Sequence, residues 1–233
     1  MLTHRLLFRT ARKLSHGGFT LVELLVVIGI IAILAGVALG PITGGILKAK
    51  ESAGMQSARS INLLCFEFST DNSQVYPAGA GTGFQGKSEG IAIQLLQGKY
   101  ANDPTIFCIT GGGFVPYSGN NASFSDFSAS NVSWDFTCEG SSSSATGATS
   151  SSSDLLPVVF CTGETITYPT TSGTAYNLPL SGTGTFQNNG IAVAYKGNSA
   201  TFLKGTLSGS GAVVSGFISA SFNDTASYVQ VKP

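Results

Sequence analysis

The sequence has few charged residues for its length. Only 10% of its 233 residues are charged, whereas glycine alone numbers 30. The surface must therefore be polar mainly through Ser, Thr, Asn and Gly, which fits an extracytoplasmic protein better than a cytosolic enzyme. A chain of this length can form one domain, or one domain and an extended element.

Side chains that act as bases or metal ligands are also scarce. The two histidines, His4 and His16, both precede residue 19. The acidic residues are scattered without the spacing of a metal-binding loop, and no serine lies in a GxSxG or SxxK context. We therefore expect no enzymatic activity, no metal site and no cofactor.

The net charge of zero hides a difference between the first residues and the rest. From Phe19 onward there are 8 basic and 12 acidic residues, a net charge of −4. No basic stretch with interleaved aromatic residues occurs there, so we expect no nucleic-acid binding. Residues 1–18 contain four basic residues and no acid: Arg5, Arg9, Arg12 and Lys13.

The four cysteines have no CxxC spacing and do not predict a zinc site. Cys65 lies on an apolar helical stripe, which favours a buried thiol over a disulfide to the rest of the chain. Among Cys108, Cys138 and Cys161 the sequence leaves all three pairings open. We favour Cys138–Cys161, because this disulfide would clamp the base of a serine-rich loop.

A long apolar run follows the basic residues. The small pair Gly17-Gly18 precedes this run, whereas the cleavage site of a secretory signal peptide would follow it, so we expect the run to be retained. The 19 uncharged residues from Leu24 to Ile42 would form a helix of roughly 28 Å, enough to cross a bilayer once. Basic residues on the N-terminal side only predict a cytoplasmic N-terminus.

One carboxylate, Glu23, interrupts the start of this run. An ordinary signal anchor would have no use for it, since a charge inside a bilayer costs about 2.5–3.5 kcal/mol. The stretch Gly18-Phe19-Thr20-Leu21-Val22-Glu23, between the basic leader and the apolar run, resembles the class III signal of type IV pilins and type II secretion pseudopilins. The resemblance covers about the first 50 residues.

The resemblance implies a processing path. A prepilin peptidase would cleave after Gly18, and the new N-terminal residue, Phe19, would be N-methylated. Glu23 would then neutralise the terminal amine of a neighbouring subunit. Pairing these two charges would offset much of the desolvation cost that each would have if buried alone. Many type IV pilins have a proline at the position of Gly40, whereas here Pro41 follows, and we expect a kink or unwound stretch in this region.

The chain as a whole is expected to be an α+β protein of the pilin kind. After the cleaved leader, 1–18, residues 19–71 should form a long helix, apolar in its first half and amphipathic in its second. Residues 72–233 should form a head with a mostly antiparallel β-sheet that packs on this helix. The expected head elements are a helix at 90–100, strands at 105–110, 131–138, 157–162, 211–221 and 227–231, a hairpin at 190–195 and 199–204, and an exposed Ser/Gly-rich loop at 139–153.

These features predict a pilin-like subunit of a bacterial type II secretion pseudopilus. The alternatives are a type IV pilus subunit for adhesion, motility or DNA uptake, and a membrane-anchored surface protein that never polymerises. The resemblance implies as partners other pilin or pseudopilin subunits, a prepilin peptidase, an inner-membrane assembly platform and, before assembly, the lipid bilayer. The precursor would cross the inner membrane once with its head in the periplasm, and would later join a periplasmic or extracellular filament.

Overall fold

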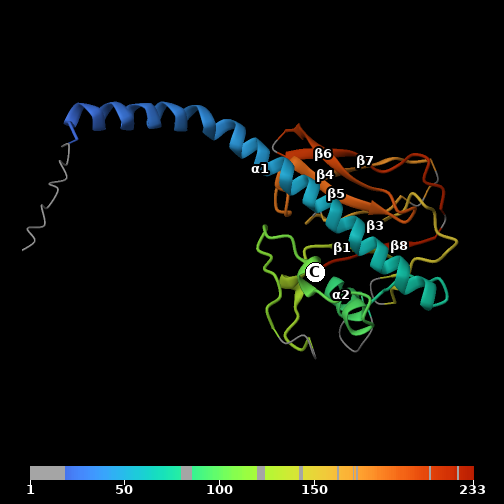
Figure 1. The fold of residues 1–233 in the computed structure, drawn as a ribbon. Helices are drawn as coiled ribbons and strands as arrows, with labels where there is room; N and C mark the ends of the chain where they lie inside the picture. Colours follow the sequence, from blue (N-terminus) through green and yellow to red (C-terminus); the bar gives the residue numbers. More distant parts are fainter. Residues whose placement is uncertain are drawn as a thin grey trace, which may run out of the picture. The chain divides into compact units, whose positions relative to one another are not determined.

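The computed structural model describes most of the chain after the leader (Figure 1). The expected leader, 1–18, lies outside the described residues. The chain divides into two compact units, Met1–Leu47 and Lys48–Pro233. The described residues are 19–79, 86–119, 124–141, 144–161, 163–169, 171, 173–209, 211–224 and 226–233.

Helix α1 (Leu21–Asp71) is a single uninterrupted α-helix. The unwinding that we expected near Gly40 and Pro41 does not occur, because a proline removes only one backbone hydrogen bond from a helix whose other bonds remain. The Thr43 hydroxyl also donates to the Gly40 carbonyl at 2.9 Å. The buried residues of α1 recur every three or four positions in its second half: Gly54, Ala58, Ile61, Asn62, Cys65, Phe68 and Ser69.

The head contains an antiparallel sheet, which confirms the predicted α+β class. Among the described residues, its strands follow the order β2-β1-β3-β5-β6-β7-β4, and β8 pairs with β1. The strands are β1 (Asp135–Glu139), β2 (Thr146–Gly147), β3 (Pro157–Phe160), β4 (Tyr176–Leu180), β5 (Gly190–Tyr195), β6 (Ala200–Ser208), β7 (Gly211–Ile218) and β8 (Tyr228–Val231).

The second half of α1 packs across one face of this sheet (Figure 1). A Cβ added at Gly54 would lie 2.5 Å from Cζ of Phe186 and 3.3 Å from the Cβ of Ala192 in β5, so glycine allows α1 to pack closely here and a larger residue would displace the Phe186 ring. About two turns further along α1, the Asn62 side chain donates to the Tyr195 carbonyl at 3.0 Å. The largest fully buried side chains include Trp134, Phe107, Phe136, Phe160 and Phe217.

The expected hairpin is confirmed by the pairing of β5 with β6, from Gly190 opposite Lys204 to Ala194 opposite Ala200. The expected helix at 90–100 is α2 (Ser88–Gln97). Short 3₁₀ helices of the head include η2 (Ala129–Asn131) and η3 (Gln187–Asn189).

The prediction of a strand at 105–110 is wrong. Residues Pro104–Phe107 form a 3₁₀ helix, η1, because the Asp103 carboxylate accepts hydrogen bonds from the Thr105 amide at 2.9 Å and its hydroxyl at 2.7 Å. The strand expected at 131–138 begins only at Asp135.

The exposed loop expected at 139–153 is only partly exposed among the residues that the structure describes. This segment contains β2, and Ala145, Ala148 and Ser152 in it are buried. The Glu139 carboxylate organises it by accepting hydrogen bonds from the Thr149 amide at 3.1 Å, the Thr149 hydroxyl at 3.3 Å and the Ser152 hydroxyl. Hydrogen bonds to this carboxylate thus add order to the burial of a few small side chains.

Close packing of β2 gives a testable consequence. A Cβ added at Gly147 would lie 1.6 Å from the Tyr76 carbonyl oxygen, a contact that forces the backbone apart. We expect Gly147→Ala to lower the free energy of unfolding by about 3 kcal/mol, measured by urea denaturation. The control Thr146→Ala, at an exposed neighbour in the same strand, should change it by less than about 0.5 kcal/mol. Equal stability of the two variants would contradict the packing.

Candidate assembly site

The N-terminal end of α1 is closed by a reciprocal pair of hydrogen bonds. Thr20 immediately precedes the helix, and its backbone amide donates to Glu23 Oε2 at 2.9 Å. The Glu23 amide in turn donates to the Thr20 hydroxyl oxygen at 3.3 Å, and this hydroxyl donates to Glu23 Oε2 at 2.7 Å. This arrangement is a capping box, in which two amides that have no partner within the helix are satisfied.

The capping box fixes the position of the carboxylate. Glu23 lies in the first turn of α1, where the partial positive charge of the helix end favours an acidic side chain. The Thr20 amide and the Thr20 hydroxyl both donate to the same oxygen of this carboxylate, Oε2. The side chain is therefore held in one orientation by contacts within its own helix.

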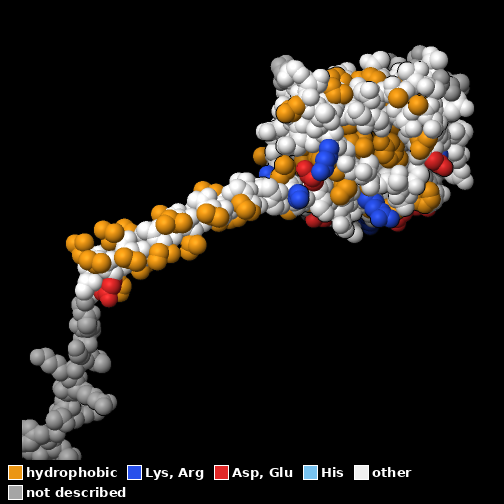
Figure 2. All heavy atoms as spheres, turned by 90° about the horizontal axis from the view of Figure 1, so that it is seen from above, with side chains coloured by type: hydrophobic (Ala, Val, Ile, Leu, Met, Phe, Trp, Pro, Cys, Tyr) orange, Lys and Arg blue, Asp and Glu red, His pale blue; other side chains and the backbone are white. Residues whose placement is uncertain are grey.

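The first half of α1 exposes its large apolar side chains, and many of them are visible on the face shown in Figure 2. Its large apolar residues are exposed by 45–78%, from Val27 at the lower end to Leu21 at the upper. Glu23 is the one charged residue between Phe19 and Leu47. In the described part of the chain, α1 is the helix that is long and apolar enough to cross a membrane. A surface of this kind is stable only in lipid or against other apolar helices.

The capping box can be tested by itself. We expect Thr20→Val to destabilise the first turn of α1 by about 1 kcal/mol, because the hydroxyl acceptor is lost. The amides of the first turn should then exchange with deuterium about five times faster in detergent micelles. Thr20→Ser keeps the hydroxyl and should exchange at the wild-type rate. Equal rates in all three proteins would show that this hydroxyl does not cap the helix.

The remaining predicted site residues lie in different places. Gly18 is outside the described residues, and Phe19 is 73% exposed next to the capping box. Sequence reasoning assigned Glu23 but missed Thr20, although the spacing Thr-x-x-Glu before an apolar run is the sequence signature of a capping box.

The predicted disulfide between Cys138 and Cys161 is absent, and both residues are free, buried thiols. The register of β1 and β3 explains this. Asp135 lies opposite Phe160, so Cys138 and Cys161 are offset by about four residues, roughly 13 Å along antiparallel strands. A disulfide needs Cα atoms within about 7 Å. Cys65 is a buried free thiol, as its place on the apolar stripe predicted.

Burial should make three of the thiols unreactive. It raises the pKa of Cys138 and of Cys161 to about 12, and it also raises the pKa of Cys65. Because the thiolate is the reactive form, a maleimide should label the half-buried Cys108 first in the native protein. After unfolding without reductant, all four thiols should react. If mass spectrometry counted fewer than four reactive thiols in the unfolded protein, the conclusion that all four cysteines are free thiols would be contradicted.

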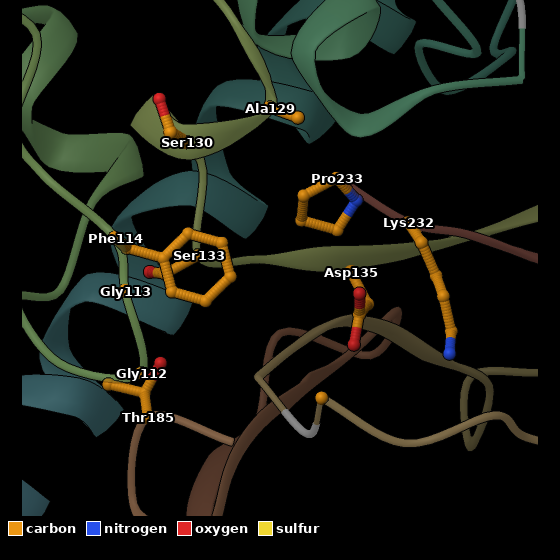
Figure 3. Close-up of a pocket in the computed structure, with 11 residues that line it drawn as sticks. Gly112, Gly113, Phe114, Ala129, Ser130, Ser133, Asp135, Thr185, Lys232 and Pro233 are labelled. Carbon is orange, nitrogen blue, oxygen red and sulfur yellow. The ribbon is translucent and has the colours of Figure 1, made fainter. Parts of the chain in front are cut away.

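The head also contains a cavity of about 330 Å³ beside the start of β1. In Figure 3 the ring of Phe114 and the side chain of Lys232 lie on either side of the buried Asp135. The described residues contain no group of three or more His, Cys, Asp or Glu side chains that could hold a metal ion. Asp135 is the one acidic side chain among the residues that line this cavity.

Comparison with known proteins agrees with the geometry at the N-terminus. Residues 13–39 match the family model described as the prokaryotic N-terminal methylation motif. No solved structure matched the fold. The motif implies processing by a prepilin peptidase and polymerisation into filaments. The protein therefore carries, on an exposed apolar helix, the N-terminal methylation motif of a type IV pilin-like prepilin.

Proposed function

We propose that this protein is a structural subunit of the pseudopilus of a bacterial type II secretion system. In this proposal it has no enzymatic activity. In this proposal the prepilin peptidase removes residues 1–18 in the inner membrane, and Phe19 is methylated. The assembly platform then moves the subunit from the bilayer into a filament. The observation that carries the proposal is the combination of the methylation motif with an apolar helix that has a single, oriented carboxylate at its start.

Glu23 supplies the specificity of assembly in this proposal. The amine of Phe19 on a neighbouring subunit would approach the Glu23 carboxylate, and the pair would be buried among the apolar helices of the filament core. Each charge offsets the desolvation of the other, whereas a subunit in the wrong register leaves both unpaired. The capping box lowers the cost further, because the carboxylate is already ordered.

A type IV pilus subunit would use the same N-terminal chemistry, so the choice of machine is tested by deletion of the gene. In the pseudopilus proposal, the deletion strain retains secreted proteins in the periplasm and keeps normal surface pili. The culture supernatant is assayed by quantitative mass spectrometry, and pili are counted by electron microscopy. Loss of pili with normal secretion would overturn the proposal in favour of a type IV pilus.

A further inference from the structure

A second candidate site lies within the head, at the end of α1. A pocket of about 350 Å³ opens between the last turns of α1 and the segment that follows β2. This volume lies in the range of small-molecule sites. Its lining combines aromatic and polar side chains: Phe66, Ser69, Thr70, Gln74, Tyr76, Ser150, Asp154 and Lys196.

The pocket lining contains one basic and one acidic side chain, and the basic one already has hydrogen-bond partners within the protein. The Lys196 ammonium donates to the Ser150 carbonyl at 3.2 Å and the Ser152 carbonyl at 2.6 Å, and it lies 3.5 Å from Asp154 Oδ1. An ammonium group has three hydrogens to donate, so none is left for an anionic ligand. The side chain of Asp154 is 82% exposed and presents acceptor oxygens to the solvent. Neutral ligands with hydroxyl donors therefore fit better than anions.

The same pocket is also lined by apolar side chains. Phe66 is 54% exposed, although Cys65 and Phe68 of α1 are buried. Tyr76 is 5% exposed and lines the same pocket. A pocket lined by both an exposed aromatic side chain and a carboxylate suits a ligand with one apolar face and hydroxyl groups at its edge.

The end of α1 forms part of the pocket wall. Ser73 and Gln74, just after the helix, have positive φ angles of 55° and 60°. Left-handed residues commonly end a helix in this way. The Gln74 amide donates to the Ser69 carbonyl at 2.7 Å, which closes the turn and places the exposed Gln74 in the pocket wall.

We propose that this pocket binds a neutral pyranose sugar. The Phe66 ring packs against the C–H face of the sugar, and the Asp154 carboxylate accepts hydrogen bonds from its hydroxyl groups. Lys196 does not contact the sugar but holds Asp154 in position. This site is independent of the assembly chemistry at Glu23, so its test does not depend on the proposed pseudopilus function.

The test uses the full-length mature protein in a polyoxyethylene detergent, since maltoside and glucoside detergents carry sugars themselves. Saturation-transfer NMR is recorded with the methyl glycosides of glucose, galactose and mannose, and with galacturonate as a charged counterpart of galactose. We expect at least one methyl glycoside to bind, and galacturonate to bind more weakly than methyl galactoside. Phe66→Ala and Asp154→Asn should each weaken binding about tenfold.

Leu63→Ala is the matched control, because Leu63 is also an exposed apolar residue of α1 and lies outside the pocket lining. It should bind the sugar as the wild type does, and all three variants should keep the wild-type melting temperature. The proposal is overturned if no methyl glycoside binds at on the order of 10 mM, if Phe66→Ala binds normally, or if galacturonate binds as well as methyl galactoside. Loss of filament incorporation in Phe66→Ala without sugar binding would identify this face as a subunit contact instead.

Discussion

We expect Glu23→Gln subunits to enter the membrane and to be processed, yet to reach filaments at about one hundredth of the wild-type level. Glutamine at this position can still accept the hydrogen bond from the Thr20 amide, so the capping box survives. What it loses is the negative charge. Breaking a buried ion pair by removing one partner costs about 3–5 kcal/mol, which corresponds to two or more decades in an equilibrium constant.

The substitution Glu23→Ala removes the charge and the cap together. The cap alone contributes about 1 kcal/mol, so Glu23→Ala should be only slightly worse than Glu23→Gln if the charge is the main term. The measurement is the ratio of subunit in sheared, sedimented filaments to subunit in the membrane fraction, by quantitative immunoblot. If Glu23→Gln assembled normally and Glu23→Ala did not, the residue would act through the helix start, and the pairing with Phe19 would be refuted.

The methylation motif accounts for how well the N-terminus could be predicted. Its residues are adjacent in the sequence, so their chemistry could be recognised without knowing the fold. The capping box shares this property, since Thr20 and Glu23 are three positions apart. The hairpin of β5 and β6 was predictable for the same reason, because two β-prone runs flank a short turn.

Two of the errors concern features that depend on contacts between separate segments. The order in the serine-rich segment comes from Glu139 and from Lys196, whose ammonium lies 2.6 Å from the Ser152 carbonyl oxygen. Composition alone gives no sign of either bond. The pairing of Cys138 with Cys161 failed similarly, because the register of β1 and β3 sets the distance and the sequence does not state it.

Strand β4 (Tyr176–Leu180) was missed for a local reason. It contains Pro179, and a proline in an apolar run argues against a strand. The sheet tolerates this residue because β4 is at the end of the strand order, with β7 as its neighbour, so one side of its backbone needs no partner strand. Proline is compatible with a strand at the edge of a sheet, but the sequence alone does not show which strand lies at the edge.

We expect Gly18→Leu to abolish processing, so that the full precursor accumulates in the inner membrane. A bulky residue at the predicted cleavage site would exclude the peptide bond from the peptidase. The retained leader keeps its four basic residues and no acid, and these charges hold the N-terminus on the cytoplasmic side. The amine of Phe19 would never form, so Glu23 would have no partner in the filament. Filament incorporation should therefore fall below the level of Glu23→Gln.

The control for this experiment is Gly17→Ala, which changes the other glycine of the pair by a single methyl group. Mass spectrometry of the N-terminal peptide should find a methylated Phe19 in the wild type and in Gly17→Ala, and an intact leader in Gly18→Leu. The two variants differ in processing but share the apolar helix, so a difference in assembly between them must come from the N-terminus. A mature N-terminus at Phe19 in Gly18→Leu would place the recognition elsewhere, whereas normal assembly of the uncleaved precursor would show that the free amine is not what Glu23 needs.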